Sequence, residues 1–389
     1  MSTPIETGNP GPLVAAGRTA GAIARTGPTS KTRSPLRRGE AKAGWLFVAP
    51  AVLIILIFML IPVAAALWVS VSNWTGRGSP LAASYIGLDN YQALLGKPNL
   101  QQRDLATALR NNLYYVILVV PLQTILALTL ALVLNRRRLA GRGFFRTAFY
   151  FPSVTSSVAI SIVFLFIFNA SGVTNAVLAW FGVHGPNWFA DPRGVLQLLL
   201  GALGVDSAHP PGWLMSHSFL GLNWWQWLSG PSIAMCAIMF LAIWTTGGTF
   251  MLIFLAALQD IPEDIEEAAA VDGASSWQIF RKVLIPQLKP TLFLVITLGL
   301  IGTWQVFDQV YIMTQGGPSK TTLTPAYLSY QTSFKNGKWG QGAAIAFILF
   351  FIIVIFSLLQ RFVMRDRKTL PRRHRFASWA DGMPTKGGS

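Results

Sequence analysis

Six apolar stretches, each about as long as a bilayer is thick, constrain this chain more than any other feature. They cover residues 45–71, 113–134, 148–168, 232–255, 291–313 and 343–362. A transmembrane helix needs about 20 such residues. In lipid, only helices and closed barrels satisfy every backbone polar group. The sequence therefore predicts an all-α integral membrane protein with six transmembrane helices.

The composition supports a membrane protein and disfavours two other classes. Only 12% of residues are charged, whereas soluble domains carry about 25%. Lys and Arg outnumber Asp and Glu by 31 to 15, but they lie between the apolar stretches and form no amphipathic face, which disfavours nucleic-acid binding. The single cysteine, Cys236, lies in an apolar stretch and cannot form an intrachain disulfide.

The two ends of the chain are polar and basic. Residues 1–44 are rich in Gly, Ala, Pro, Ser, Thr and Arg without apolar periodicity, so we expect a disordered basic cytoplasmic tail. The first apolar stretch is longer than the 7–15 residues of a signal-peptide core and is expected to remain as a helix. The predicted membrane domain is 45–363, and 364–389 is a second basic cytoplasmic tail.

The loops differ in their content of basic residues. If the N-terminus is cytoplasmic, the cytoplasmic segments hold 23 of the Lys and Arg residues and the opposite loops hold 8. Cytoplasmic loops of membrane proteins carry this excess. The sequence therefore predicts a multi-pass protein of the cell membrane with both termini in the cytoplasm.

The predicted outer loop 169–231 is long and rich in tryptophan. Two interpretations remain open. One is an interfacial aromatic belt with an amphipathic segment, Val195 to Leu203, lying on the membrane. The other is a docking surface for an external partner. The tryptophans are Trp180, Trp188, Trp213, Trp224, Trp225 and Trp227.

The cytoplasmic loop 256–290 is unusually acidic. It holds three of the five Glu residues of the chain, and six acidic residues lie between 260 and 272. Asp260 is suited to cap a helix, and Pro262 to its first turn. Gly273 is suited to end that helix. We predict a short helix, a glycine turn and a second helix on the cytoplasmic face.

This loop resembles the signature of permeases of binding-protein-dependent ABC importers. That signature reads Glu-Ala-Ala, three residues, Gly, nine residues, Ile, one residue, Leu-Pro. Here it is Glu267-Ala268-Ala269, Gly273, Val283 and Ile285-Pro286, with the same spacing. Further stretches resemble the carbohydrate-uptake branch, the maltose and glycerol-phosphate type: 86–91, 141–146, 254–262, 272–274 with 277–278, and 314–318.

The resemblance implies a role and partners. Residues 256–290 would form a coupling loop that docks on a separate ABC ATPase, which hydrolyses the ATP. A second, similar permease would complete the translocation path, and an extracytoplasmic solute-binding protein would deliver the solute. The residues implied in ATPase coupling are Glu267, Ala268, Ala269, Asp272, Gly273 and Pro286.

The residues themselves indicate no chemistry, so we expect a protein that is not an enzyme and binds neither cofactor nor metal. Gly96-Lys97 and Gly337-Lys338 are followed by Pro98 and Trp339, so neither is a phosphate-binding loop. The histidines lack metal-ligand spacing; they are His184, His209, His217 and His374. A stand-alone secondary transporter or a membrane-bound enzyme remains an alternative, but it would need charged residues or repeats that are not evident.

The helices flanking the coupling loop carry the candidate path residues. Aromatic faces and hydrogen-bonding side chains bind sugars, although a Thr in a helix often bonds its own backbone and a Trp often only packs. Away from their ends the stretches hold no Lys or Arg and one acid, Asp308, so we predict a neutral hydroxylated solute such as a sugar; glycerol phosphodiesters and polyols are alternatives. The candidates are Trp244, Thr245, Thr246, Thr249, Thr303, Trp304, Gln305, Asp308 and Gln309.

Overall fold

The computed structural model describes residues 35–96, 98–136, 139–204 and 212–364. The chain forms two compact units that meet between Ile61 and Pro62. The first contains α1 (Pro35–Ile55), which begins before the predicted start of the first span at Trp45, and a π-helical turn over Leu56–Leu60. The helix α2 (Ile61–Ser70) follows directly. The remaining predicted tail residues, 1–34 and 365–389, lie outside the described part.

Five apolar helical segments of the described chain are long enough to cross a membrane, which confirms the all-α membrane fold. They are Lys42–Ser70, α4 (Leu100–Asn135), α11 (Ile233–Gln259), Lys289–Met313 and α18 (Trp339–Val363). The fourth is divided into α15 (Lys289–Trp304) and α16 (Asp308–Met313).

The predicted third span is not one straight helix. It is formed by α5 (Arg142–Val154) and α6 (Ser157–Ile167), which are bent by 99° relative to each other. Pro152 removes one backbone donor near the break, and Thr155 and Ser156 have extended backbones. The expectation of six spans therefore holds only if this bent pair counts as one.

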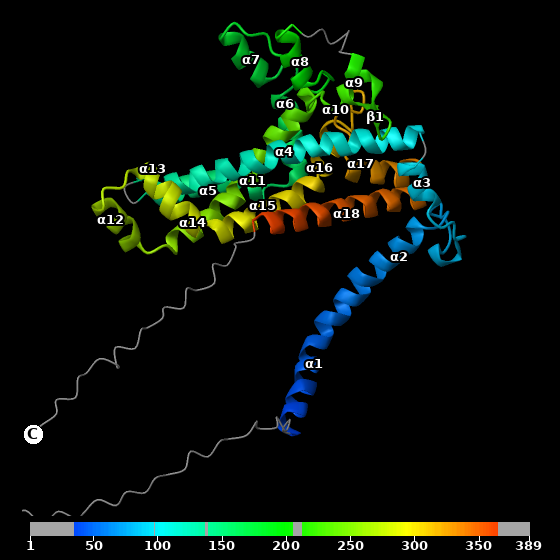
Figure 1. Cartoon of the computed structure of the whole chain (residues 1–389), viewed down its shortest axis with the longest axis horizontal. Helices are drawn as coiled ribbons and strands as arrows, with labels where there is room; N and C mark the ends of the chain where they lie inside the picture. The colour runs from blue at the N-terminus through cyan, green and yellow to red at the C-terminus, as the bar shows by residue number, and fades with distance from the viewer. Residues whose placement is uncertain (1–34, 97, 137–138, 205–211, 365–389) are drawn as a thin grey trace, which may run out of the picture. The chain divides into compact units, whose positions relative to one another are not determined.

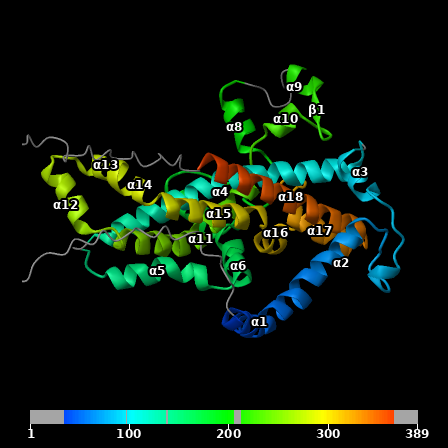
Figure 2. The same cartoon turned by 60° about the horizontal axis from the view of Figure 1, so that its bottom comes forward.

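The core of the second unit lies between α4 and α11. Figures 1 and 2 both show α4, α11, α15 and α18 running side by side. Ala127 and Ala131 of α4 are fully buried against the cluster of Met251, Phe254 and Leu255 from α11. Small residues allow helix backbones in a membrane to approach closely, so these alanines set the distance between the two central helices.

The two ends of this bundle carry different elements (Figures 1 and 2). At one end lie α12 (Glu263–Val271), α13 (Ser276–Ile279), a π-helical turn over Phe280–Leu284 and α14 (Ile285–Gln287). At the other end lie α3 (Asp89–Leu95) and α17 (Pro325–Tyr330). A 3-10 turn over Pro80–Ala82 precedes α3, and a π-helical turn over Gln331–Lys335 follows α17.

The segment 169–231 folds into short elements. These are α7 (Val173–Trp180), α8 (Val195–Ala202), α9 (Gly212–Ser216), a hairpin of β1 (Ser218–Phe219) and β2 (Leu222–Asn223), and α10 (Trp224–Trp227). Ser218 lies opposite Asn223 in the antiparallel pair. The helix α8 coincides with the predicted amphipathic segment.

The tryptophans of this segment divide into packed and exposed residues. Trp188 packs edge-on against Phe168 and donates to Asn175 Oδ1, and Trp225 is 7% exposed. Trp180 and Trp213 are 83% and 70% exposed. Some of these rings therefore hold the segment together, while others are free to contact lipid or a partner, so both predicted roles remain open.

At Gly248, α11 packs closely against α5, and a substitution there tests this contact. A Cβ at this position would lie 2.3 Å from Phe149 O and 2.6 Å from Ser153 Oγ. We predict that Gly248→Ala destabilises the protein by about 1–3 kcal/mol through overpacking, seen as a lower apparent melting temperature in detergent. Gly143→Ala is the control, because a Cβ there meets nothing within 4 Å. An unchanged melting temperature for Gly248→Ala would contradict this packing.

Candidate functional site

A cavity of about 230 Å³, lined by both polar and apolar side chains, lies between α4, α11 and the broken helix α15–α16. Tyr115 and Gln123 of α4 form one wall, and Thr245 and Thr246 of α11 form another. The third wall is the break between α15 and α16. The three long helices that build the core thus also build the cavity.

The break in the third wall begins after Trp304. Gln305 ends α15 by donating its N–H to Gly302 O, and α16 begins at Asp308. Phe307 has φ −136° and ψ −58°, which is not helical. In membrane proteins, a helix interrupted at membrane depth is tolerated where it lines a cavity or is buried in protein. Gln305, Phe307 and Asp308 line this one.

The structure brings six of the nine predicted path residues to this cavity. They are Thr245, Thr246, Thr303, Gln305, Asp308 and Gln309. A second cavity of about 270 Å³ adjoins it and shares Thr245, Thr246 and Gln309. Thr249 lines the second cavity together with Ser153, Thr155 and Ser157 from the bend between α5 and α6.

The two predicted tryptophans lie outside both cavities. The ring of Trp244 packs against Phe164, with centroids 5.6 Å apart. Trp304 is 2% exposed and packs against Phe356 at 5.2 Å. Both rings therefore pack against neighbouring helices. The apolar surface of the first cavity comes instead from Tyr115, Phe250 and Phe307.

The threonine hydroxyls bond to their own helices. Thr245 Oγ1 donates to Leu241 O at 3.0 Å, Thr246 Oγ1 to Ala242 O at 2.6 Å and Thr303 Oγ1 to Gly299 O at 2.8 Å. A hydroxyl has only one proton. While these bonds persist, the oxygens can accept a hydrogen bond from a solute but cannot donate one.

Gln123 is a cavity residue absent from the predicted path residues. Its side chain is 1% exposed, and its Oε1 lies 2.7 Å from Thr246 Oγ1. Its Nε2 has no hydrogen-bond partner in the structure, and a Cβ at Gly299 would lie 2.4 Å from it. The signal was visible in the sequence, since Gln123 is an amide inside an apolar stretch.

The coupling loop has the predicted helix, glycine turn and second helix. The acidic residues Glu263, Asp264 and Glu266 occupy the first turn of α12, where the helix dipole favours negative charge. Gly273 has φ +80°, a conformation that glycine adopts readily. Ser275 and Gln278 form a capping box at the start of α13. Pro262 is the N-cap of α12, whereas Asp260 ends α11, so the expected capping role of Asp260 is wrong.

The coupling loop presents an exposed surface and a grooved one. Ala268, Asp272 and Gly273 are exposed, as is Pro286 of α14. Val271 and Trp277 are large apolar residues with exposures of 87% and 66%. The apolar side chains favour contact with a protein, because large exposed apolar residues gain free energy when they are covered.

The grooved surface of α12 faces α4 and α5. Glu263, Glu266 and Glu267 line a groove of about 500 Å³ together with Arg136 and Arg142. Glu267 was predicted either to pair with an ATPase or to cap within the loop. Its position beside two arginines of the same chain adds a third possibility.

Comparison with known proteins identifies the chain's family. A family model described as binding-protein-dependent transport system inner membrane component matches residues 123–369. The chain belongs to this family. It is 34% identical over 340 residues to the lactose transport system permease protein LacF of Rhizobium radiobacter, covering 87% of this chain and 99% of LacF. It is 29% identical to the trehalose/maltose permease MalF of Thermococcus litoralis, covering 86% and 98%.

Two solved structures share the fold. A bacterial ABC transporter involved in importing the acidic polysaccharide alginate matches with a TM-score of 0.62 and 17% identity, over 86% of this chain and 99% of that one. The alginate transporter in complex with its pentasaccharide-bound periplasmic protein matches with a TM-score of 0.60 and 18% identity, over 84% and 96%.

The family settles the general role. The chain is a multi-pass membrane permease component of a binding-protein-dependent transport system. The named relatives are transport permeases and not enzymes, which agrees with the prediction. The resemblance stated from the coupling-loop signature is confirmed.

Proposed function

We propose that this chain forms half of the translocation path of an importer for a neutral, hydroxyl-rich solute, namely a sugar. The observation that carries the proposal is the cavity at the break between α15 and α16, with its amides, hydroxyls and one carboxylate. The named relatives that transport lactose and trehalose or maltose support the sugar class.

The lining of the cavities favours a neutral solute. Of the residues that the structure describes, no Lys or Arg lines either cavity, and Asp308 is the single charged residue in the first. An anionic solute would lose hydration there without gaining a compensating charge from this chain. A glycerol phosphodiester would need a cation from elsewhere, whereas a sugar or a polyol would not.

The partners of the proposed importer follow from the family and from the shape of the site. The first cavity, at about 230 Å³, is smaller than the roughly 300–1,000 Å³ of typical small-molecule sites. A second, similar permease would enclose the solute from the other side. ATP would be hydrolysed by separate ABC ATPase subunits, and a solute-binding protein would supply the solute.

Substitutions in the cavity test the path. In the complete importer reconstituted in proteoliposomes, we predict that Thr245→Val and Gln309→Leu raise the KM for sugar uptake about three- to tenfold, the effect of losing one hydrogen bond. Thr129→Val is the control, because Thr129 is an exposed α4 residue that lines neither cavity. Unchanged KM values for both cavity variants would contradict the assigned path.

A screen of the purified cognate binding protein separates the substrate from the path. We expect sugars to raise its melting temperature. Stabilisation by amino acids or peptides alone would defeat the sugar proposal while leaving the importer role intact.

The proposed orientation places both termini and α12–α14 in the cytoplasm. In a Cys236→Ala background, an impermeant maleimide applied to intact cells is expected to label Arg77→Cys and to spare Asp264→Cys until the membrane is permeabilised. Both positions are exposed. Labelling of Asp264→Cys in intact cells would reverse the orientation and remove the coupling loop from the ATPase side.

The exposed surface of α12 and its glycine turn is proposed to dock on the ATPase. Gly273→Asp should lower sugar-dependent ATPase activity and uptake at least tenfold without preventing membrane insertion, because it adds a charge and bulk where the loop turns. A Cβ at Gly273 meets nothing within 4 Å, so the variant creates no clash inside the chain.

Gly337→Asp is the matched control for the coupling experiment. Gly337 also has positive φ, at +68°, and open space around it, but it lies at the opposite end of the bundle. Equal losses for both variants would point to backbone strain, and normal uptake by Gly273→Asp would reject the coupling role.

A further inference from the structure

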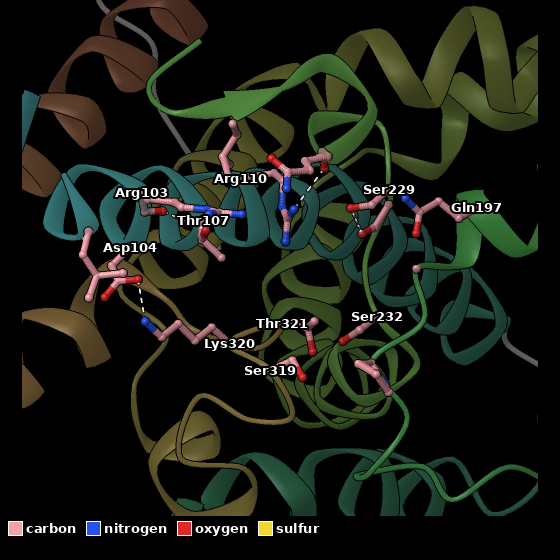
Figure 3. A pocket seen from close by; sticks show the side chains of 16 residues that line it. Arg103, Asp104, Thr107, Arg110, Gln197, Ser229, Ser232, Ser319, Lys320 and Thr321 are labelled. Atoms are coloured by element: carbon pink, nitrogen blue, oxygen red, sulfur yellow. Dashed lines mark hydrogen bonds and ion pairs between the residues drawn. The ribbon is translucent and has the colours of Figure 1, made fainter. Parts of the chain in front are cut away.

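A separate polar pocket, of about 440 Å³, lies at the end of the bundle that carries α3 and α17. Three segments enclose it: the first part of α4, residues of the 192–232 region, and the loop 319–321. Figure 3 shows Arg103, Thr107 and Arg110 on α4, with Ser232, Ser319 and Lys320 around the opening. In the proposed orientation, this pocket faces the outside.

The pocket carries an excess of positive charge. Three cations line it, Arg103, Arg110 and Lys320, against a single carboxylate, Asp104. Lys320 Nζ lies 2.6 Å from Asp104 Oδ1, so these two neutralise each other. The two arginines are seven residues apart and therefore lie on the same face of α4. Among the described residues no acid forms an ion pair with either arginine, so they place two positive charges on one side of the pocket.

Arg110 is the more deeply placed arginine. It is half-buried, and its contacts are with neutral groups: Nη1 donates to Gln226 O at 3.0 Å, and Nη2 to Asn111 Oδ1 at 2.8 Å. Among the described residues, no carboxylate forms an ion pair with it. A guanidinium has five N–H donors, and Nε also faces Asn111 Oδ1, so two donors remain for a ligand.

An unpaired, half-buried charge is costly, and an incoming anion would reduce that cost. A carboxylate suits the remaining donors best, because a guanidinium binds it with directed, charge-assisted hydrogen bonds. The Ser232 hydroxyl supplies a further donor around the same opening, because its oxygen accepts from Met235 N–H and its proton stays available. The chemistry of the pocket is therefore that of a carboxylate receptor.

This pocket is separate from the proposed solute path. Tyr115 and Gln123 of α4 line the path cavity, and at 3.6 residues per turn they are rotated about 140° and 220° from Arg110 around the helix axis. The two cavities thus open on different sides of α4. A solute moving through the path cavity would not pass Arg110, which disfavours a transported anion as the occupant.

We propose that this pocket receives an acidic side chain of the extracytoplasmic solute-binding protein, which pairs with Arg103 and Arg110 when that protein docks. The inference rests on the proposed importer function and adds the chemistry of one docking contact. A protein side chain fits better than a lipid, because the lining is mostly polar and its aliphatic residues are few: Leu100, Pro192 and Leu222.

The test measures binding of the sugar-loaded cognate binding protein to the complete importer in nanodiscs of zwitterionic lipid. Arg103→Gln and Arg110→Gln are each expected to weaken the affinity about tenfold and to flatten its dependence on salt. Arg77→Gln is the matched control, because it removes an exposed cation of the outer segments that does not line the pocket, and it should leave the affinity unchanged.

Arg103→Gln keeps the test valid if Arg110→Gln fails to fold. The Arg103 side chain is exposed, while Arg110 also tethers α4 to Gln226. A charge reversal, Arg103→Glu, should be rescued by an acid-to-Lys change at one position of the binding protein. Unchanged affinity in both glutamine variants, or no rescue by any acid-to-Lys change, would overturn the proposal.

Three further arms separate other sources of a carboxylate or an anion. Binding of free glucuronate at the arginines that leaves the affinity for the binding protein unchanged would assign the pocket to a soluble acid. A dependence of the arginine effects on anionic lipid would assign it to a lipid headgroup. Loss of affinity in Asp206→Asn equal to that of Arg110→Gln would assign the counter-ion to this chain, since Asp206 lies outside the described residues. Each of these results would reject the docking proposal.

Failure of this inference is distinguishable from failure of the proposed function. Stimulation of the wild-type importer's ATPase by the sugar-loaded binding protein establishes that the two work together, whatever the arginine variants show. If that stimulation occurs and both variants bind normally, the importer proposal stands and the pocket proposal falls. If it does not occur with any sugar, the proposed function as a sugar importer fails.

Discussion

In hydrocarbon, a backbone N–H or C=O without a partner costs several kcal/mol, and the functional part of this structure depends on that constraint. A spanning helix can be interrupted only where protein or a water-filled cavity covers the break. The described spans have two such interruptions, after Val154 and after Trp304. Residues at each of them line one of the two adjoining cavities.

The packing of α4 against α11 holds the two interruptions next to the cavities that their residues line. Buried alanines on α4 allow a close approach, and Ser153 bonds α5 to the α11 backbone by donating to Thr245 O and accepting from Thr249 N. Gln123 extends the same network across to Thr246. The side chains that tie the helices together are therefore neighbours of those proposed to contact the solute, which links stability of the bundle to the shape of the path.

The two ends of the bundle differ in how their charged side chains are arranged. At the coupling end, three glutamates of α12 line a groove together with two arginines, so charges of both signs lie along it. At the other end, the pocket on α4 holds arginines without a matching acid among the described residues. The second end therefore has a charge that a partner can satisfy.

Much of the architecture could be predicted from local sequence because the lipid environment imposes simple rules. The long apolar stretches are helical as predicted, although α1 and α4 begin well before their predicted starts and two of the stretches are interrupted. The coupling loop also followed from local chemistry: the acidic first turn of α12, the positive φ of Gly273 and the capping box of Ser275 and Gln278 all lie within a few residues of one another.

The sequence by itself thus determined the membrane class, the helical spans and the coupling motif, because these depend on hydrophobicity, length and short-range hydrogen bonds. Only the tertiary structure decided which polar residues meet. It turned Trp244 and Trp304 toward other helices, brought Gln123 to Thr246, and placed no acid of the described residues in an ion pair with Arg110. Such pairings join residues far apart in the chain, and hydrophobic periodicity does not encode which faces of the helices pack together.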